Sequence, residues 1–149
     1  MELLDQTKTN GGSEMMAEVG LPRDVYTDQE VFIRTVREGV SGRILKKAVS
    51  AMPDDRKVFV RLLETDSGNL HRFYKRKSLG RAQSEELLDT LKLYIEAEKV
   101  FGDREIAEDW LHTPVPALSG SRPVDLFDTF AGRAMVRQAL RKISFGEFS

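Results

Sequence analysis

A run of basic residues near the middle of the chain has the spacing needed to bind nucleic-acid phosphates. No acidic residue occurs between Asp66 and Glu85, and a helix in this stretch would hold Arg72, Lys75 and Arg76 on one face. Cations arranged in this way neutralise phosphates and release their counterions. We predict that the residues that bind DNA are Asn69, His71, Arg72, Lys75, Arg76 and Lys77. The alternative is an ordinary solvated basic face.

This basic stretch follows a helix predicted over residues 54–64, and the two together would form a helix-turn-helix unit. Asn69 and His71 would then lie near the start of the second helix, where a recognition helix meets the edges of bases. The turn departs from the usual pattern because its glycine, Gly68, comes late. Acidic residues of the first helix, such as Asp54 and Asp55, would also oppose a DNA backbone.

The last six residues, SFGEFS, form a second segment with distinctive chemistry. Two phenylalanines, Phe145 and Phe148, would be exposed at a free chain end unless they fold back onto the protein or dock into a partner. Gly146 between them allows the backbone to turn in a narrow space. We predict docking into a partner.

Catalytic and metal-binding groups are scarce in this sequence. The chain has no cysteine and only two histidines, His71 and His112, so we expect no metal site. We find no nucleophile motif and no phosphate-binding glycine loop. The Asp and Glu residues could supply an acid–base pair, but their spacing singles none out. We therefore predict no catalytic residue, no cofactor and no enzymatic activity.

The composition favours a folded, mainly helical protein. Of 149 residues, 40% are apolar and 32% are charged, and the net charge is -1. No apolar run approaches the roughly 20 residues that cross a bilayer, and the first residues do not resemble a secretory signal. We expect a cytoplasmic protein that does not contact a membrane.

The order of helical and turn signals predicts an all-α fold in three parts. Residues 1–27 are expected to be a mobile leader, residues 28–82 a helix-turn-helix-like domain, and residues 83–149 a linking helix followed by a second small helical domain. Residues 124–127 carry the one weak strand signal. The residues expected to cap helices are Ser41, Asp54, Ser84, Asp103 and either Asp128 or Thr129.

The last third of the chain carries the most specific pattern. Its elements, in order, are VFGD at 100–103, WL at 110–111, PVPAL at 114–118, RPVDL at 122–126, AG at 131–132 and FG at 145–146. This series resembles the toxin-binding domain of Xre/MbcA/ParS antitoxins, and residues 31–82 resemble the family's Xre-like domain more loosely. One departure is Val115, which stands where the family commonly has asparagine in the proline loop.

The resemblance implies an antitoxin whose C-terminal end enters the active site of an NAD-consuming RES-domain toxin. Phe145 and Phe148 would fill apolar subsites, and Glu147 would face the cationic groups that otherwise hold NAD phosphates. The resemblance also implies a homodimer that binds operator DNA. The residues expected to bind the toxin are Arg122, Asp125, Arg133, Arg137, Arg141, Lys142, Phe145, Gly146, Glu147, Phe148 and Ser149.

Other classes of protein remain open on the sequence. A free-standing helix-turn-helix transcription regulator would use its C-terminal domain for dimerisation and would need no partner gene. An antitoxin would be encoded beside a toxin and would co-purify with it. A scaffold that only pairs helices has the same periodicity.

Overall fold

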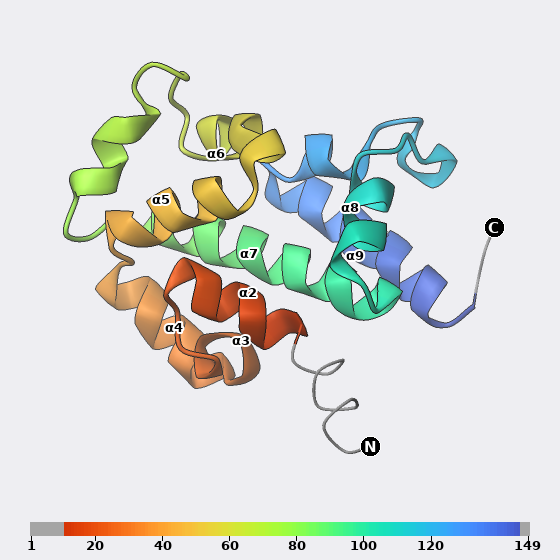
Figure 1. Ribbon diagram of the computed structural model, residues 1–149, viewed down its shortest axis with the longest axis horizontal. Coiled ribbons are helices and arrows are strands. Elements are labelled where there is room, and N and C mark those ends of the chain that lie inside the picture. The colour runs from red at the N-terminus through yellow and green to blue at the C-terminus, as the bar shows by residue number, and fades with distance from the viewer. Residues whose placement is uncertain (1–10, 147–149) are drawn as a thin grey trace.

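The computed structural model describes residues 11–146, and the architecture within them is built around one long helix, α7 (Arg81–Phe101) (Figure 1). Helix α7 is buried on several sides, because its apolar residues recur at helical spacing. Fully buried examples are Leu87, Leu88, Leu91 and Ile95. The helix ends at Gly102, whose φ of 73° gives the left-handed C-cap that glycine adopts without strain. Within residues 11–146 the regular elements are all helices, which confirms the predicted all-α fold.

The first helices of the described chain lie before residue 52. They are α2 (Gly11–Val19), α3 (Asp24–Thr27), α4 (Gln29–Glu38) and α5 (Gly42–Ala51). Two of them, α2 and α4, pack against α7. The Asp28 carboxylate caps α4, and the Ser41 hydroxyl caps α5 by accepting a hydrogen bond from the Arg43 amide at 3.1 Å. Ser41 is the cap that the sequence predicts.

Residues 11–27 differ from the mobile leader expected there. Met15, Met16 and Val19 of α2 are buried, because α2 packs against both α5 and α7. Arg104, the first residue of α8 (Arg104–Leu111), also reaches α2, with 2.7 Å between its guanidinium and the Glu18 carboxylate. This part of the predicted leader therefore belongs to the core, and its short apolar run gave too little periodicity to show it. Residues 1–10 lie outside the described residues.

The segment between α5 and α7 contains η1 (Pro53–Asp55), α6 (Arg56–Leu62) and the 3₁₀ helix η2 (Leu70–Lys75). Asp54 lies in η1 and does not cap α6, contrary to the prediction. The second helix of the predicted helix-turn-helix unit, expected over residues 69–77, is also corrected: the structure has the shorter 3₁₀ helix η2 there. The backbone is extended at Arg76, whose carbonyl accepts a hydrogen bond from the Gly42 amide of α5 at 2.9 Å.

Gly42 allows this close contact between α5 and η2. A Cβ atom at this position would collide with the carbonyl oxygen of Phe73 and would lie 2.7 Å from that of Tyr74. The missing side chain therefore seats η2 directly against the first turn of α5.

Ser84 lies inside α7 and not at its start, which corrects another predicted cap. The helix begins three residues earlier, at Arg81. The buried Ser84 hydroxyl instead accepts a hydrogen bond from the Val40 amide at 3.0 Å and lies 3.3 Å from the Leu79 carbonyl. It thus ties the α4–α5 turn to α7.

After α7 come α8 (Arg104–Leu111), two 3₁₀ turns, η3 (Pro116–Leu118) and η4 (Pro123–Leu126), and the last helix, α9 (Phe130–Ser144). Asp103 caps α8 as predicted, and Thr129, one of the two predicted candidates, caps α9. The weak strand signal at 124–127 was wrong, because Pro123 begins a 3₁₀ turn there.

The proline loop closes through its backbone and not through a side chain at Val115. The Val115 amide donates to the Ser121 carbonyl at 3.0 Å, and the Val115 carbonyl accepts from the Gly120 amide at 3.1 Å. Ser119 and Gly120 take positive φ values of 57° and 78° to complete the turn. The half-buried Val115 side chain packs against the core.

Elements on both sides of residue 82 share one core. Helix α7 packs against α2, α4 and α6 from the first part of the chain and against α8 and α9 from the last part. The buried apolar residues form one cluster. Helix α7 therefore joins the two parts of the chain in one core.

A buried arginine fastens α9 to α7. The Arg133 side chain is 2% exposed and donates to Asp89 at 2.7 Å, to Glu86 at 2.9 Å and to the Phe127 carbonyl at 2.8 Å. One turn later, Arg137 donates to Asp89 at 2.8 Å and to Glu96 at 2.9 Å. Burial alone would raise the pKa of Asp89, but the hydrogen bonds and charges of both arginines hold it below its usual value.

A second polar network joins η1, α7 and α8. Tyr94 donates to one oxygen of the buried Asp55 carboxylate at 2.8 Å, and His112 Nε2 lies 2.6 Å from the other. His112 Nδ1 lies 2.6 Å from the Glu108 carbonyl. Both acceptors favour a doubly protonated ring. Burial lowers the pKa of His112, but these two hydrogen bonds raise it above the usual 6.5.

We expect Arg133→Met to lower the free energy of unfolding by about 3 kcal/mol, because it leaves carboxylates and a carbonyl without their buried partner. Urea unfolding followed by circular dichroism measures this. The matched control is Arg141→Met on the exposed side of the same helix, with an expected change within about 0.5 kcal/mol. Equal effects of the two substitutions would contradict the anchoring role of Arg133.

We expect His112→Gln to cost about 1.5 kcal/mol at pH 6, the contribution of a hydrogen bond to a charged group. A raised folded pKa means that the stabilisation by His112 is complete below pH 6.5 and is lost as pH rises through the folded value. The difference in unfolding free energy between wild type and variant should therefore disappear above the folded pKa of His112. The pKa of Glu98, raised by burial to about 7, lowers stability of both proteins from pH 4.5 upward and cancels in the difference. A pH-independent gap would refute the assignment.

Candidate functional site

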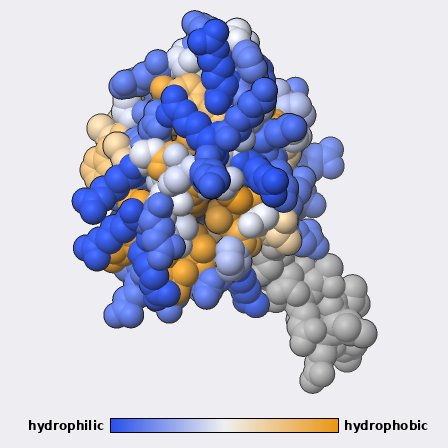
Figure 2. Space-filling model, turned by 90° about the vertical axis from the view of Figure 1, so that its left-hand side faces the viewer, coloured by the Kyte–Doolittle hydropathy of each residue, from blue (hydrophilic) through white to orange (hydrophobic). Residues whose placement is uncertain are grey.

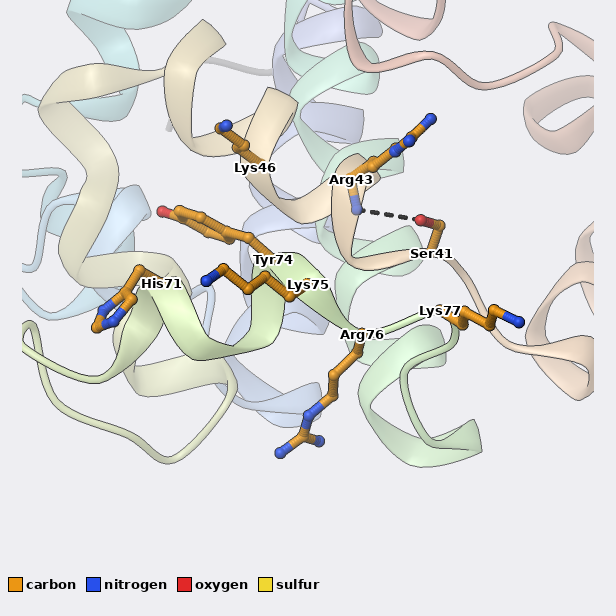
Figure 3. A pocket seen from close by; sticks show the side chains of 8 residues that line it. All are labelled: Ser41, Arg43, Lys46, His71, Tyr74, Lys75, Arg76 and Lys77. Atoms are coloured by element: carbon orange, nitrogen blue, oxygen red, sulfur yellow. Dashed lines mark hydrogen bonds between the residues drawn. The ribbon is translucent and has the colours of Figure 1, made fainter.

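A basic groove lies between α5 and η2 at one end of the molecule. It measures about 630 Å³, and among the described residues its lining contains cations and no acid. Figure 3 shows that the side chains come from two segments, α5 with the turn before it and η2 with the residues after it, around the same opening. The residues that line it are Ser41, Arg43, Lys46, His71, Tyr74, Lys75, Arg76 and Lys77.

The groove brings together four of the six residues predicted to bind DNA, namely His71, Lys75, Arg76 and Lys77. Arg72 is exposed but does not line the groove. The Asn69 amide is held by Asp66, to which it donates at 2.8 Å, so it is engaged in the turn before η2. Asn69 and Arg72 are thus the two predicted DNA-binding residues that do not line the groove.

Two cations of the groove, Arg43 and Lys46, were missed by the sequence reasoning. They lie one turn apart on α5, and Lys47 follows on the same exposed side in an adjoining hollow. The i, i+3 spacing of basic residues after the Ser41 cap was a signal for them. Only the packing of η2 on α5 shows that the two basic stretches form one surface.

The face of the molecule that carries η2 is largely hydrophilic. Figure 2 shows polar side chains over most of its upper part and an apolar area lower down. Tyr74 contributes an aromatic ring among the cations of the groove, and Arg76 lies over the Phe73 ring at 4.3 Å. Cations on this surface can pair with the phosphates of a polyanion, and its aromatic and guanidinium groups can stack on planar groups such as nucleic-acid bases.

The predicted toxin-binding residues divide into inward-facing and outward-facing groups. Arg133 and Arg137 face α7, where their carboxylate partners hold them, so Arg133 is removed from the predicted rim and Arg137 is largely occupied. Arg141 is exposed and Lys142 is half-buried. Sequence periodicity placed all four on α9 but could not assign a direction to the first two, because it does not show the acids of α7 opposite them.

Arg122 and Asp125 form an exposed pair on η4. Two nitrogens of the guanidinium each donate to a carboxylate oxygen at 2.9 Å. The hydrogen bond from Arg122 is the main cause that lowers the pKa of Asp125. Both side chains of the pair face solvent.

Helix α9 ends at Ser144, and Phe145 and Gly146 are the last residues that the structure describes. Phe145 is 79% exposed, and Gly146 has a φ of 77°, which turns the backbone away from the helix. A smaller hollow of about 320 Å³ beside Phe145 is lined by residues of α7 and α9 together with Tyr26. Glu147, Phe148 and Ser149 lie outside the described residues.

Residues 11–146 were searched for clusters of metal-binding side chains and for helices that could span a membrane. In this part of the chain no group of three His, Asp or Glu side chains could hold a metal ion. None of the helices described there is both long enough and apolar enough to span a bilayer.

Comparison with known proteins points to one family. A family model described as the antitoxin Xre/MbcA/ParS C-terminal toxin-binding domain matches residues 96–146, from the second half of α7 to the end of α9. A curated protein of Sphingobium sp. (strain YBL2), named Prs ADP-ribosylating antitoxin, is 31% identical over an alignment of 127 residues. The match covers 78% of this chain and 80% of the relative. The chain therefore belongs to the Xre/MbcA/ParS family of antitoxins.

Proposed function

We propose that this antitoxin blocks an NAD-consuming toxin of the RES-domain type by inserting its C-terminal end into the toxin's active site. The observation that carries the proposal is the end of α9: the ion pairs of Arg133 and Arg137 fasten the helix to α7, and Phe145 at its C-terminal end is exposed. A rigid stem loses little conformational freedom on binding.

The residues after this stem have the chemistry of a plug. Phe145 and Phe148 would occupy apolar subsites, and Gly146 would let the backbone bend inside the cleft. Glu147 would pair with cationic groups that otherwise bind the phosphates of NAD. Arg141 and Lys142 lie next to Phe145 and would form the polar rim there. The Arg122–Asp125 pair would contact the toxin at the other end of α9.

The printed name of the Sphingobium relative supports a connection with NAD chemistry, since it mentions ADP-ribosylation. We assign that activity to the toxin and a non-enzymatic inhibitory role to the antitoxin. In support, the family model that matches this chain describes a toxin-binding domain.

A second proposed function is binding of operator DNA through the α5–η2 groove. The groove collects basic residues from two elements and has no acid in its described lining. Because η2 is a short 3₁₀ helix, we expect phosphate contacts to dominate over base contacts. A homodimer would present two such grooves to a two-fold symmetric operator.

The plug is tested by deleting residues 145–149. We expect the truncated chain to lose protection when it is co-expressed with the toxin encoded beside it, because the active site would be open to NAD. Cellular NAD concentration is the readout. Phe145→Ala with Phe148→Ala keeps the chain length and should lose most of the protection. Full protection by both variants would refute the plug.

The groove is tested by Arg43→Glu with Lys46→Glu, measured by fluorescence anisotropy with a duplex from the region upstream of the gene. We expect weaker binding, and a slope of log affinity against log salt that is smaller by about 1.8, the loss of two phosphate contacts. The control is Arg34→Glu with Arg37→Glu on α4, which changes the charge equally outside the groove. An unchanged salt slope in the α5 variant would contradict the assignment.

A further inference from the structure

The contacts of one side of α9 with the core determine which residues of the helix face solvent. Val136 and Leu140 are buried with Arg133, so the opposite side of the helix points into solvent. Five exposed residues follow one another there at intervals of four, four, three and four positions, which we call the outer stripe. The outer stripe consists of Phe130, Ala134, Gln138, Arg141 and Phe145.

The two ends of the outer stripe are unusually exposed aromatic residues. Phe130 is 75% exposed and Phe145 is 79% exposed. Met135, on the neighbouring flank of α9, is also an exposed large apolar side chain. Aromatic side chains each bury a large apolar area when they find a partner, so a set of them left in water marks an interaction surface.

The distance between the two phenylalanines is fixed by the helix. Fifteen residues separate them, which at the helical rise corresponds to about 22 Å. Small and flexible side chains, Ala134 and Gln138, lie between them and permit close approach of another surface. This is the arrangement of a helix that lies in a groove with an anchor at each end.

The orientation of this helix is independently enforced at its start. Thr129 caps it by accepting from the Gly132 amide at 2.9 Å. A Cβ atom at Gly132 would collide with the Leu126 carbonyl, so the first turn sits directly on η4. The first turn of α9, which carries Phe130, is therefore fixed against η4, and the Phe130 side chain is exposed there.

The position of the outer stripe within the chain identifies its partner. All of α9 falls inside residues 96–146, the part that matches the toxin-binding domain, and Phe145 is where the stripe meets the proposed plug. We propose that the outer stripe docks into an apolar groove on the toxin beside its active site, with Phe130 as the anchor farthest from the plug. The inference rests on the proposed function, since it takes the toxin as the partner.

The test uses Phe130, because it lies outside the segment removed with the plug. We expect Phe130→Ala to raise the dissociation constant for the purified toxin about 30-fold, the effect of losing an aromatic anchor. Ile33→Ala on α4, an apolar side chain that is 40% exposed outside the matched region, should change it less than twofold. Isothermal titration calorimetry gives both constants, and equal melting temperatures show that both variants fold.

Each result separates the two proposals. A wild-type dissociation constant for Phe130→Ala, with protection lost on deletion of 145–149, would overturn the outer stripe and leave the plug. If Phe130→Asp dissociates an antitoxin dimer in light scattering without weakening toxin binding, the stripe is an interface between copies and the inference is wrong. Failure of the wild-type chain to bind the toxin would overturn the proposed function and the stripe together.

Discussion

The buried Arg133 is the interaction on which the C-terminal half depends. Removing a guanidinium from water costs several kcal/mol unless its donors are satisfied, and here Asp89, Glu86 and the Phe127 carbonyl accept from it. These acceptors come from α7 and from the turn before α9, so they determine both the position of α9 and its rotation. With the inward side occupied, Phe130 and Phe145 can only face outward. The surface proposed for the toxin is therefore a consequence of an internal ion network.

Helix α7 transmits this constraint to the rest of the molecule. It contacts helices from both ends of the chain, and the Asp55–Tyr94–His112 network joins it to η1 and α8. In Figure 1, η2 and the end of α9 lie at opposite ends of the molecule, with α7 between them. The two proposed binding surfaces are thus separated on one continuous core.

Much of the helical framework could be predicted from local signals. The caps at Ser41 and Asp103 were predicted correctly, and the cap of α9 was narrowed to Asp128 or Thr129, because a side-chain oxygen next to an apolar repeat depends on the first turn alone. The family was also recognised from short motifs in the last third of the chain. The prediction was wrong for the caps at Asp54 and Ser84 and for the α-helix over 69–77, where contacts with distant residues decide the backbone. Gly42 and Val40, which hold η2 and Ser84, lie about 30 to 45 positions away.

The helical periodicity, the basic stretch around η2 and the family of the protein can all be inferred from the amino-acid sequence. The direction of each charged side chain depends on the packing of distant segments. Arg133, Arg137 and Arg141 are alike in the sequence, yet the first two meet carboxylates more than 40 positions away while the third faces solvent. The same holds for Arg43 and Lys46, which join the basic groove only because η2 folds back onto α5. Periodicity is a local property, whereas burial and charge pairing depend on what another part of the chain places opposite.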